Sequence, residues 1–539
     1  MTAPLRDPAA GGEPTGVTFD QFRHAVMDLV FGGCCASPSL SVMRSRSVPP
    51  MRNNTPFRRL GHDAWIRTVP PRDPILPAVS GAFVLPAVVI ASSGAHDTAP
   101  VDVLVSGGRI ERITPAGAAK PPAGARVVEH TRGCFVASSL LDMHVHLPAA
   151  NALRLTELFL LQMLRHGITV ARDAGDSDGT ATPAALACVA SGALAGPALH
   201  YTYAFVNAPP ARWSNSFAYV DPEQAPLIVK RLQWLGASWI KSYENLDLAR
   251  LDALKQAARE AGMGVMGHVP ARLGHEEALL PDSQHLFGVP PPKSIRRDHV
   301  LNRAIDWQAV DAHRMDVVRR ASVEHDLTLT PTLHLAAGVL ELERYEQACQ
   351  ESTAKALPSF FSAVAWHPVR GIPAYRNISR DDFDRCRAAM ELKGELVQRL
   401  HQDGVRVLLG TDTQQPFSAP GIALHREFQA FDYAGIARRD SFTLATEVAA
   451  EVLAITDMGT VRAGARAELM VSRTDPRQSG WSVERDLAPT IARGVLMTAP
   501  DLDQAIRTEL ARFENRFGEY MSRLLAQLAM NRLAKNFVG

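Results

Sequence analysis

Short apolar segments alternate with helical segments from about residue 138 to about residue 455. Strands are predicted at 168–172, 239–243, 264–268, 284–287, 327–333 and 405–409, and helices at 153–165, 248–261, 306–325 and 383–403. Such alternation indicates βα units, which assemble into a parallel sheet. About eight units close a barrel, and a stretch of this length accommodates them. The sequence therefore predicts an α/β fold built on a (β/α)8 TIM-like barrel over residues 138–455.

Strand-like segments flank the predicted barrel on both sides. They lie at 84–90, 101–106, 109–113, 127–128 and 134–137 before the barrel, and at 467–472 and 490–497 after it. Gly107-Gly108 stands between two of them and is typical of a two-residue hairpin turn. We therefore expect residues 76–137 and 456–500 to form one small β-sandwich domain from both flanks of the barrel.

The two ends of the chain differ in character. Residues 1–75 form a predicted extension that is largely irregular, with helical spacing only at 18–31. Residues 501–539 predict one amphipathic helix, which would pack against the barrel or against a second copy of the chain in a homo-oligomer. Its apolar stripe consists of Leu502, Ile506, Leu510, Phe513, Phe517, Met521, Leu525 and Leu528.

Composition argues against several classes of protein. The 539 residues carry a formal net charge of +1, which gives no sign of a nucleic-acid or membrane-surface partner. No run of about 18 apolar residues suggests a membrane-spanning helix. The six cysteines suggest neither a disulfide framework nor a C-x-x-C zinc site. The first residues lack the pattern of a signal peptide, so we expect a cytoplasmic protein.

The segment 140–147 contains the first candidate metal ligands. Apolar residues run up to Asp142, and His144 and His146 follow, one residue apart. Side chains alternate between the two faces of a strand, so these two imidazoles point the same way. Two imidazoles on one face at the end of a strand can hold a metal ion. The alternative is a chance pair, or a pair that is hydrogen-bonded in the core.

Four further polar residues lie at the ends of predicted strands, and they are Lys241, His268, His285 and Asp412. Each has an ordinary structural explanation, because a lysine can extend to solvent, a histidine can lie in the core and an aspartate can cap a helix. Together they are of ligand-forming types and fall at one end of the strands, where the reactive residues of parallel barrels lie. We therefore predict that they form one site with the histidine pair.

These residues stand within longer motifs. The motifs are Asp142-Met-His144-Val-His146, His166-Gly-Ile-Thr-Val-Ala-Arg172-Asp173, Ile240-Lys241-Ser-Tyr243, Gly267-His268-Val-Pro270, Gln284-His285-Leu and Gly410-Thr411-Asp412, followed by Pro420-Gly421, His425-Arg-Glu427, Ala445-Thr446 and Gly459-Thr-Val-Arg-Ala-Gly464. In type and order they resemble the amidohydrolase superfamily, over about residues 80–500, and most of all its imidazolonepropionase-like or prolidase-like dimetal branch. Two motifs depart from the family pattern: Ser138-Ser139 replaces the usual Pro-Gly, and Glu468 replaces an aspartate.

The resemblance implies a small-molecule substrate and two bound divalent metal ions. Zinc suits a histidine-rich site, with manganese and cobalt as alternatives. A hydroxide shared by the two ions would attack a polarised carbonyl, and Asp412 would act first as general base and then as general acid. The implied ligands are His144, His146 and Asp412 for one ion, His268 and His285 for the other, and Lys241, N-carboxylated, as the bridge.

Lys241 also separates the branches of the superfamily. Mononuclear deaminases lack the bridging lysine and carry a catalytic glutamate near the fifth-strand histidine, whereas Pro270-Ala-Arg follows His268 here. The resemblance therefore favours hydrolysis of an amide bond, in a dipeptide, an N-acyl amino acid or a cyclic amide. The alternatives are an esterase or lactonase, and a catalytically silent barrel kept for assembly.

Four more residues are candidates for contact with a substrate. Tyr243 lies just beyond Lys241 and could reach a substrate carboxylate or carbonyl, and His334 could line the pocket because it follows a predicted strand. His425 and Arg426 would either touch the substrate or stabilise the loop after the last strand.

Overall fold

The computed structural model describes residues 81–535 apart from 93–98, 149–152, 176–178, 191–195, 212, 214 and 298. The predicted extension over 1–75, with its helix at 18–31, lies outside the described residues. Within the part that is described, no helix is both long and apolar enough to cross a membrane.

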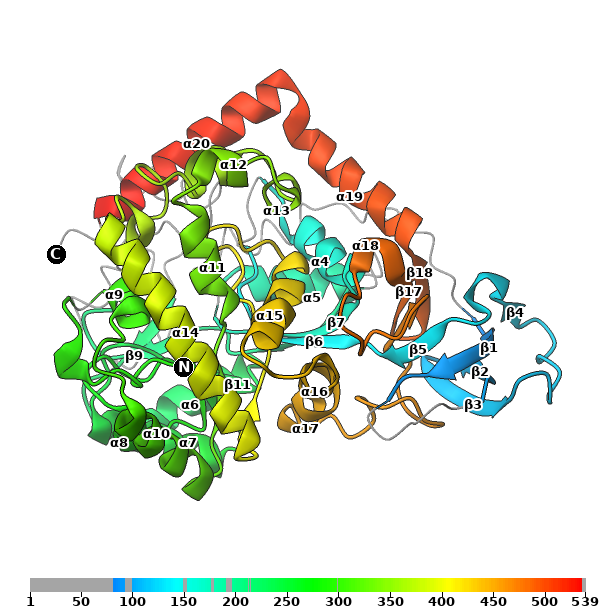
Figure 1. Cartoon of the computed structure of the whole chain (residues 1–539), viewed down its shortest axis with the longest axis horizontal. Helices are drawn as coiled ribbons and strands as arrows, with labels where there is room; N and C mark the ends of the chain where they lie inside the picture. Colours follow the sequence, from blue (N-terminus) through cyan, green and yellow to red (C-terminus); the bar gives the residue numbers. More distant parts are fainter. Residues whose placement is uncertain are drawn as a thin grey trace, which may run out of the picture.

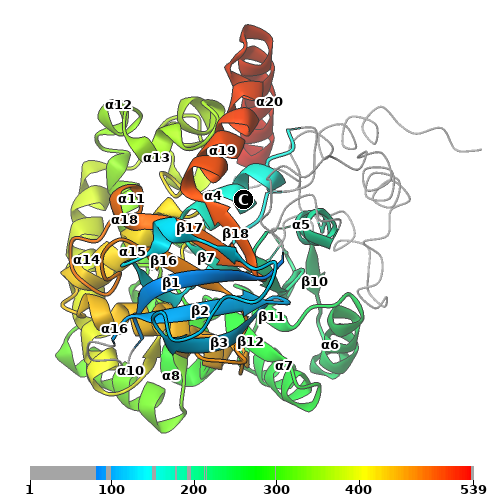
Figure 2. The same ribbon diagram turned by 90° about the vertical axis from the view of Figure 1, so that its right-hand side faces the viewer.

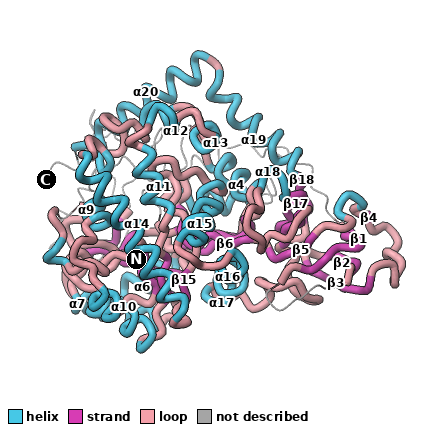
Figure 3. The backbone as a smooth tube through the Cα atoms, viewed as in Figure 1, coloured by secondary structure: helices cyan, strands magenta, loops and turns pink. Residues whose placement is uncertain are grey.

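Parallel strands lie at the centre of the barrel, as Figure 3 shows. They are β6 (Leu140–Val145), β7 (Ile168–Asp173), β8 (Ala198–Tyr201), β9 (Phe205–Asn207), β11 (Trp239–Ser242), β12 (Gly264–Gly267), β13 (Asp282–Gln284), β14 (Thr328–Thr330) and β15 (Arg406–Val407), with β10 (Ser216–Ala218) beside β9. One sheet has the order β6-β7-β8 and the other the order β10-β9-β11-β12-β13-β14-β15.

Backbone hydrogen bonds join these two sheets at both edges. The N–H of Met143 on β6 donates to the carbonyl of Leu409 just beyond β15 (3.0 Å). On the other side, the N–H of Ser238 donates to the carbonyl of Tyr201 on β8 (3.1 Å). The ring is a (β/α)8 barrel in which β8 and β9 together occupy the third position. The predicted fold class is confirmed.

Helices surround this barrel (Figure 1). Those that follow its strands are α4 (Thr156–Arg165), α5 (Ala181–Ala190), α6 (Ala225–Trp234), α7 (Leu248–Glu260), α8 (His275–Ala278), α9 (Val300–Ile305), α10 (Ala312–Glu324), α14 (Arg380–Gln402), α15 (Ile422–Tyr433), α16 (Arg438–Thr443) and α17 (Ala449–Val452). Between β14 and α14 the chain adds α11 (His334–Glu341), α12 (Tyr345–Ala348) and α13 (Ser352–Lys355). This excursion extends the barrel wall on the side where the strands end.

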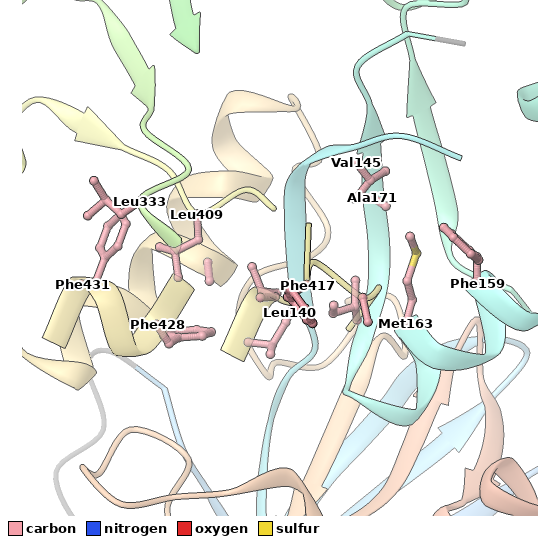
Figure 4. Packing of buried hydrophobic residues seen from close by; sticks show 14 of the residues in the cluster. Leu140, Val145, Phe159, Met163, Ala171, Leu333, Leu409, Phe417, Phe428 and Phe431 are labelled. Carbon is pink, nitrogen blue, oxygen red and sulfur yellow. The ribbon is translucent and has the colours of Figure 1, made fainter. Parts of the chain in front are cut away.

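Aromatic and aliphatic side chains fill the space between the strands and their helices (Figure 4). Phe159 on α4 and Phe428 and Phe431 on α15 are completely buried against the barrel. Every residue of β6 is buried, because helices cover one side of a barrel strand and the packed interior covers the other. The strand that carries His144 is thus packed on both of its faces.

Strands from both flanks of the barrel form a further sheet outside it. Its order is β18-β17-β16-β5-β1-β2-β3, with β4 beside β1. The strands are β1 (Phe83–Ile90), β2 (Val101–Ser106), β3 (Arg109–Pro115), β4 (Arg126–Val127), β5 (Phe135–Ser138), β16 (Leu469–Ser472), β17 (Leu487–Ala492) and β18 (Val495–Thr498), and α18 (Val483–Asp486) precedes β17. This sheet faces the viewer in Figure 2. The chain passes directly from it into the barrel, because only Ser139 separates β5 from β6.

The structure corrects three of the predicted elements. The single strand at 490–497 is a hairpin, β17 and β18, because Arg493 and Gly494 adopt positive φ angles of 51° and 74°. The strand at 284–287 ends at Gln284, and the chain turns immediately after it. The helix at 306–325 begins at Ala312, because the Asp311 side chain caps it by accepting the N–H of Arg314 (2.8 Å).

The predicted C-terminal helix is two helices, α19 (Ala499–Glu514) and α20 (Arg516–Lys535). Asn515 between them is extended, with φ −74° and ψ 149°, and its side chain accepts the N–H of Gly518 (2.8 Å) and so begins a new helix. The predicted apolar stripe therefore does not continue across the break. Phe517 is 75% exposed, whereas Ala529 is buried against the barrel side. Packing between copies of the chain stays a prediction.

Candidate active site

Three ligand-type side chains meet at the end of β6. The Nε2 atoms of His144 and His146 lie 3.4 Å apart. Asp412, which follows β15, places Oδ1 3.1 Å from His146 Nε2 and 3.7 Å from His144 Nε2. One ligand atom from each of the three residues lies within 4.8 Å of the others, which is close enough for all three to hold one ion.

Three further residues complete the cluster from neighbouring strands. Lys241 on β11 is completely buried, and its Nζ lies 3.5 Å from His144 Nε2. His285 places Nε2 3.8 Å from Asp412 Oδ2. The ring centre of His268 lies 5.0 Å from that of His285. The structure thus brings all six residues of the predicted site together at the carboxyl end of the barrel.

Hydrogen bonds orient three of the four imidazoles. In each case the Nδ1 atom faces an acceptor outside the cluster and Nε2 faces inward. A proton on Nδ1 leaves the lone pair of Nε2 free to bind a metal ion. The pairs are His144 Nδ1 with Gln284 Oε1 (2.5 Å), His146 Nδ1 with the Gly175 carbonyl (2.8 Å) and His285 Nδ1 with Thr332 Oγ1 (2.7 Å).

Burial and neighbouring charges set the ionisation of the cluster. Burial lowers the pKa of Lys241 to about 7, although the charge of Asp412 partly opposes this shift. Burial alone would raise the pKa of Asp412, but the hydrogen bond from His146 and the charge of His285 hold it well below its usual range. Asp412 is therefore a carboxylate at neutral pH, and Lys241 has a substantial neutral fraction.

The backbone is strained at two candidate metal ligands that follow the ends of strands. His285 has a φ of 62° and Asp412 a φ of 48°, in the left-handed region that residues with a β-carbon rarely adopt. The N–H of Asp412 donates to the His144 carbonyl (2.7 Å), and the N–H of His285 donates to the Thr330 carbonyl (3.0 Å). These bonds hold both residues in conformations that turn their side chains into the cluster.

Gly267 allows β12 to approach β11 closely beside the cluster. It has a φ of 141°, and a β-carbon there would lie 2.2 Å from the carbonyl oxygen of Ser242. The next residue, His268, donates its N–H to that same oxygen (3.0 Å). The glycine in the Gly-His motif is thus required by backbone packing.

A cavity of about 270 Å³ opens from the cluster. His146, Lys241, His268, His285 and Asp412 line one part of it. Most of the remaining wall is apolar and includes Phe205, Trp213, Phe287, Ile305, Leu335 and Met530. A concave, mostly apolar cavity that meets a few polar groups is the usual form of a small-molecule site.

Of the four weaker candidates, Tyr243 alone lines this cavity. Its ring stacks on His268 with the centres 4.6 Å apart, and its hydroxyl accepts a hydrogen bond from Trp213 Nε1 (2.8 Å). The expected place of His334 in the pocket wall needs correction. Its Nε2 donates to the Thr411 carbonyl (2.6 Å), so it supports the loop that carries Asp412.

His425 and Arg426 also lie away from the cavity wall. His425 Nε2 donates to the His166 carbonyl (3.0 Å), and Arg426 Nη1 donates to the Phe417 carbonyl (3.4 Å). Of the two roles proposed from the sequence, these contacts favour stabilisation of the loop after the last strand.

Several residues of the site were not identified from the sequence. Gln284 stands in a recognised motif, but its contact with His144 depends on the approach of β13 to β6. Lys393 and Tyr375 line the cavity from the segment after β14, and Met530 lines it from α20. Of these residues, Lys393 alone had a signal in the sequence. It lies two helical turns after Cys386, so a lysine stands on the buried face of the helix.

The (β/α)8 barrel and the cluster of ligand-type side chains define a class of barrel enzyme in which the reacting groups lie at the carboxyl ends of the strands. Sequence comparison is more specific, since the model of the amidohydrolase family matches residues 135–497. The chain belongs to the amidohydrolase family. No curated protein sequence matches it significantly.

Solved structures with the same fold include three of particular interest. Bottromycin amidohydrolase has a TM-score of 0.62 and 21% identity, over 92% of this chain and 97% of that one. A Xaa-Pro dipeptidase with methionine bound in its active site has a TM-score of 0.57 and 17% identity, over 78% and 100%. The ochratoxinase of A. niger has a TM-score of 0.54 and 14% identity, over 78% and 96%.

Proposed function

We propose that this amidohydrolase is a dimetal enzyme that cleaves the amide bond of a small molecule, such as a dipeptide, an N-acyl amino acid or a cyclic amide. The observation that carries the proposal is the convergence of six ligand-type side chains, five of which line one mostly apolar cavity. The similar structures include a dipeptidase and an amidohydrolase, and these names support an amide as the bond that is cleaved.

The donor atoms fit divalent cations. His144 Nε2 and His146 Nε2 lie 3.4 Å apart and both face the carboxylate of Asp412. Because their Nδ1 atoms have acceptors elsewhere, two nitrogen lone pairs converge, and a cation between them removes their repulsion. His144, His146 and Asp412 would hold one ion, and His268 and His285 the other. When bound, such ions polarise a carbonyl and lower the pKa of water.

Lys241 would bridge the two ions as a carbamate. Its amine would add to carbon dioxide, forming an N–C bond and releasing one proton. The product carries a negative charge and two oxygen atoms, so a cation that is costly to bury becomes an anionic ligand. The position of Nζ, 3.5 Å from His144 Nε2 in a fully buried site, supports this role.

Asp412 would move the proton during the reaction. Its carboxylate is ionised and faces the cavity, so it can accept a proton from the attacking water and deliver it to the departing amine. The hydrogen bond from its own N–H to the His144 carbonyl holds it beside the cluster through both steps.

Glu244 bears on the alternative of deamination. A carboxylate does lie near the fifth-strand histidine, since Glu244 Oε1 is 3.8 Å from His268 Nδ1. It comes from the end of β11, however, and it is also 3.9 Å from Arg303 Nη1. Glu244 does not line the cavity, so its place favours support of His268 over contact with a substrate.

Metal content tests the proposal. Protein purified without chelator should contain about two metal ions per chain, and Lys241→Ala should lose most of them. The control is Lys255→Ala, which removes a lysine on α7 that pairs with Asp252 and does not line the cavity, and it should keep the wild-type content. One ion, unaffected by Lys241→Ala, would contradict the bridge and favour a mononuclear enzyme.

A substrate panel tests the bond that is cleaved. Dipeptides, N-acyl amino acids and cyclic amides should be hydrolysed, and Asp412→Asn should abolish the reaction while the barrel stays folded. If only esters or lactones are cleaved, the enzyme is an esterase or lactonase and the proposed amide substrate is wrong. Full metal content without cleavage of any compound would leave the barrel as a scaffold.

A further inference from the structure

One cation lines the cavity in addition to the candidate metal ligands. Lys393 lies in the middle of α14, is 7% exposed, and faces the cavity together with Cys386 two turns earlier. Within the described residues its ammonium group forms no ion pair and no hydrogen bond. Its one specific contact is with the face of Trp307, whose ring centre is 5.5 Å from Nζ.

An unpaired buried ammonium group is costly, and the surroundings of Lys393 do not offset the cost. Glu427 is the carboxylate whose charge affects it, but the N–H groups of Leu333 (2.9 Å) and His334 (2.7 Å) occupy the two oxygens of Glu427. Burial also raises the pKa of Glu427 to about 8, so that group is mostly neutral at pH 7. A methionine at position 393 would fill the same space without a charge.

We propose that Lys393 binds a carboxylate of the substrate, so that the enzyme acts on amides with a free carboxylate and a large apolar group. This inference rests on the proposed function. Lys393 and Asp412 line the same cavity, and the charge of Lys393 acts on His285 in the cluster, so we expect one small molecule to contact both. A bound carboxylate supplies the partner that the protein does not, and hydrogen bonds between two charged groups are about twice as strong as neutral ones.

The apolar requirement comes from the rest of the wall. Ala526, Ala529 and Met530 of α20 line the cavity and are at most 5% exposed. They lie beyond residues 135–497, the part of the chain that matches the family model. Phe360 and Phe361 stand on the same wall, and the helical turn that contains Phe361 packs against α20. Among the proposed substrates, this favours N-acyl amino acids and apolar dipeptides over small cyclic amides.

Paired substrates test the role of Lys393 in turnover. N-phenylacetyl-leucine has a carboxylate, and N-phenylacetyl-leucinamide has the same scissile bond without the charge. Wild-type enzyme should have a kcat/KM at least about tenfold higher for the acid. Lys393→Met should lower kcat/KM for the acid about 10- to 100-fold, through a higher KM. It should leave kcat/KM for N-phenylacetyl-leucinamide unchanged. Lys393→Arg should restore part of the preference, and Lys255→Ala, on α7 and outside the cavity wall, should keep it.

A binding measurement separates this inference from the proposed function. Quenching of tryptophan fluorescence reports ligands in the cavity, because Trp213 lines it. Wild-type protein should bind 4-phenylbutyrate about tenfold or more tightly than 4-phenylbutyramide, and Lys393→Met should bind the two equally. Equal binding of acid and amide by the wild type, or an unchanged preference in Lys393→Met, would overturn the inference even if amides are hydrolysed. If the acid is bound more tightly than the amide only when Lys393 is present, and no amide is hydrolysed, the carboxylate subsite is supported and the proposed reaction is refuted.

Discussion

Gln284→Met should weaken metal binding although it replaces none of the proposed metal ligands. Gln284 is completely buried on β13 and accepts the Nδ1 proton of His144 (2.5 Å). Its amide nitrogen donates to Asp282 Oδ1 (2.5 Å), which fixes the direction of the side chain. Asp282 keeps Arg172 and Thr330 as partners after the substitution. His144 Nδ1 is therefore the group that loses its partner.

The size of the effect follows from the two proton positions of the ring. To bind an ion through Nε2, His144 must keep its proton on Nδ1, and a buried donor without an acceptor costs about 1–3 kcal/mol. Without a metal ion, the proton can move to Nε2 and avoid that cost. The loss therefore falls on metal binding, and we expect about a 10- to 100-fold lower affinity, equivalent to about 1.4–2.7 kcal/mol.

Competition with a fluorescent zinc chelator measures the affinity, and thermal unfolding of the metal-free protein measures the stability. The control is Gln162→Met, since Gln162 is also buried and donates to the Ala356 carbonyl (2.9 Å) away from the cluster. It should lower stability and leave metal affinity unchanged. Wild-type affinity in Gln284→Met, or an equal loss in the control, would refute the reasoning.

Three further predictions concern the barrel and its cavity. Gly267→Ala should prevent the metal-free protein from folding stably, as judged by thermal unfolding. The control is Gly262→Ala, where a β-carbon meets open space. It should lower the free energy of unfolding by only about 1 kcal/mol, because of the positive φ. Burial lowers the pKa of His166 and His275 to about 4, so between pH 6.5 and 4 the unfolded chain binds protons that the folded chain does not. The free energy of unfolding of metal-free protein should therefore fall as the pH falls through this window, by up to about 3 kcal/mol per residue, and urea titrations that show no change from pH 7 to 4.5 would contradict it. Ala529→Phe should fill part of the cavity and raise KM for substrates with bulky apolar groups more than for small ones, which steady-state kinetics on a graded series would show.

The sequence predicted the positions of the candidate ligands because their signal is local. His144 and His146 follow from the two-residue period of a strand, and Asp412 from the apolar run before it. Strand ends meet at one face of any parallel barrel, so the meeting of these residues follows from the fold class.

Other features depend on contacts that no local pattern encodes. The left-handed backbone at His285 ends β13 earlier than its apolar pattern predicts, and it is held by a bond to the neighbouring strand β14. Asn515 divides the C-terminal helix although the apolar spacing continues through it. Lys393 becomes part of the cavity only because α14 packs beside α9 and α11. Each of these outcomes is decided by tertiary packing.

The passage from β5 to β6 through Ser139 leaves no room for a hinge. Ser139 donates its N–H to the Glu468 carbonyl (3.1 Å), and its hydroxyl lies 2.5 Å from that of Thr169. The chain is thus fixed to the flanking sheet and to β7 five residues before His144. We therefore expect the two parts to unfold together, because separation of the flanking strands removes a contact that holds the start of β6. The flanking sheet in this sense anchors the barrel, and a barrel separated from it would lose the hydrogen bond from Ser139 to Glu468, five residues before His144.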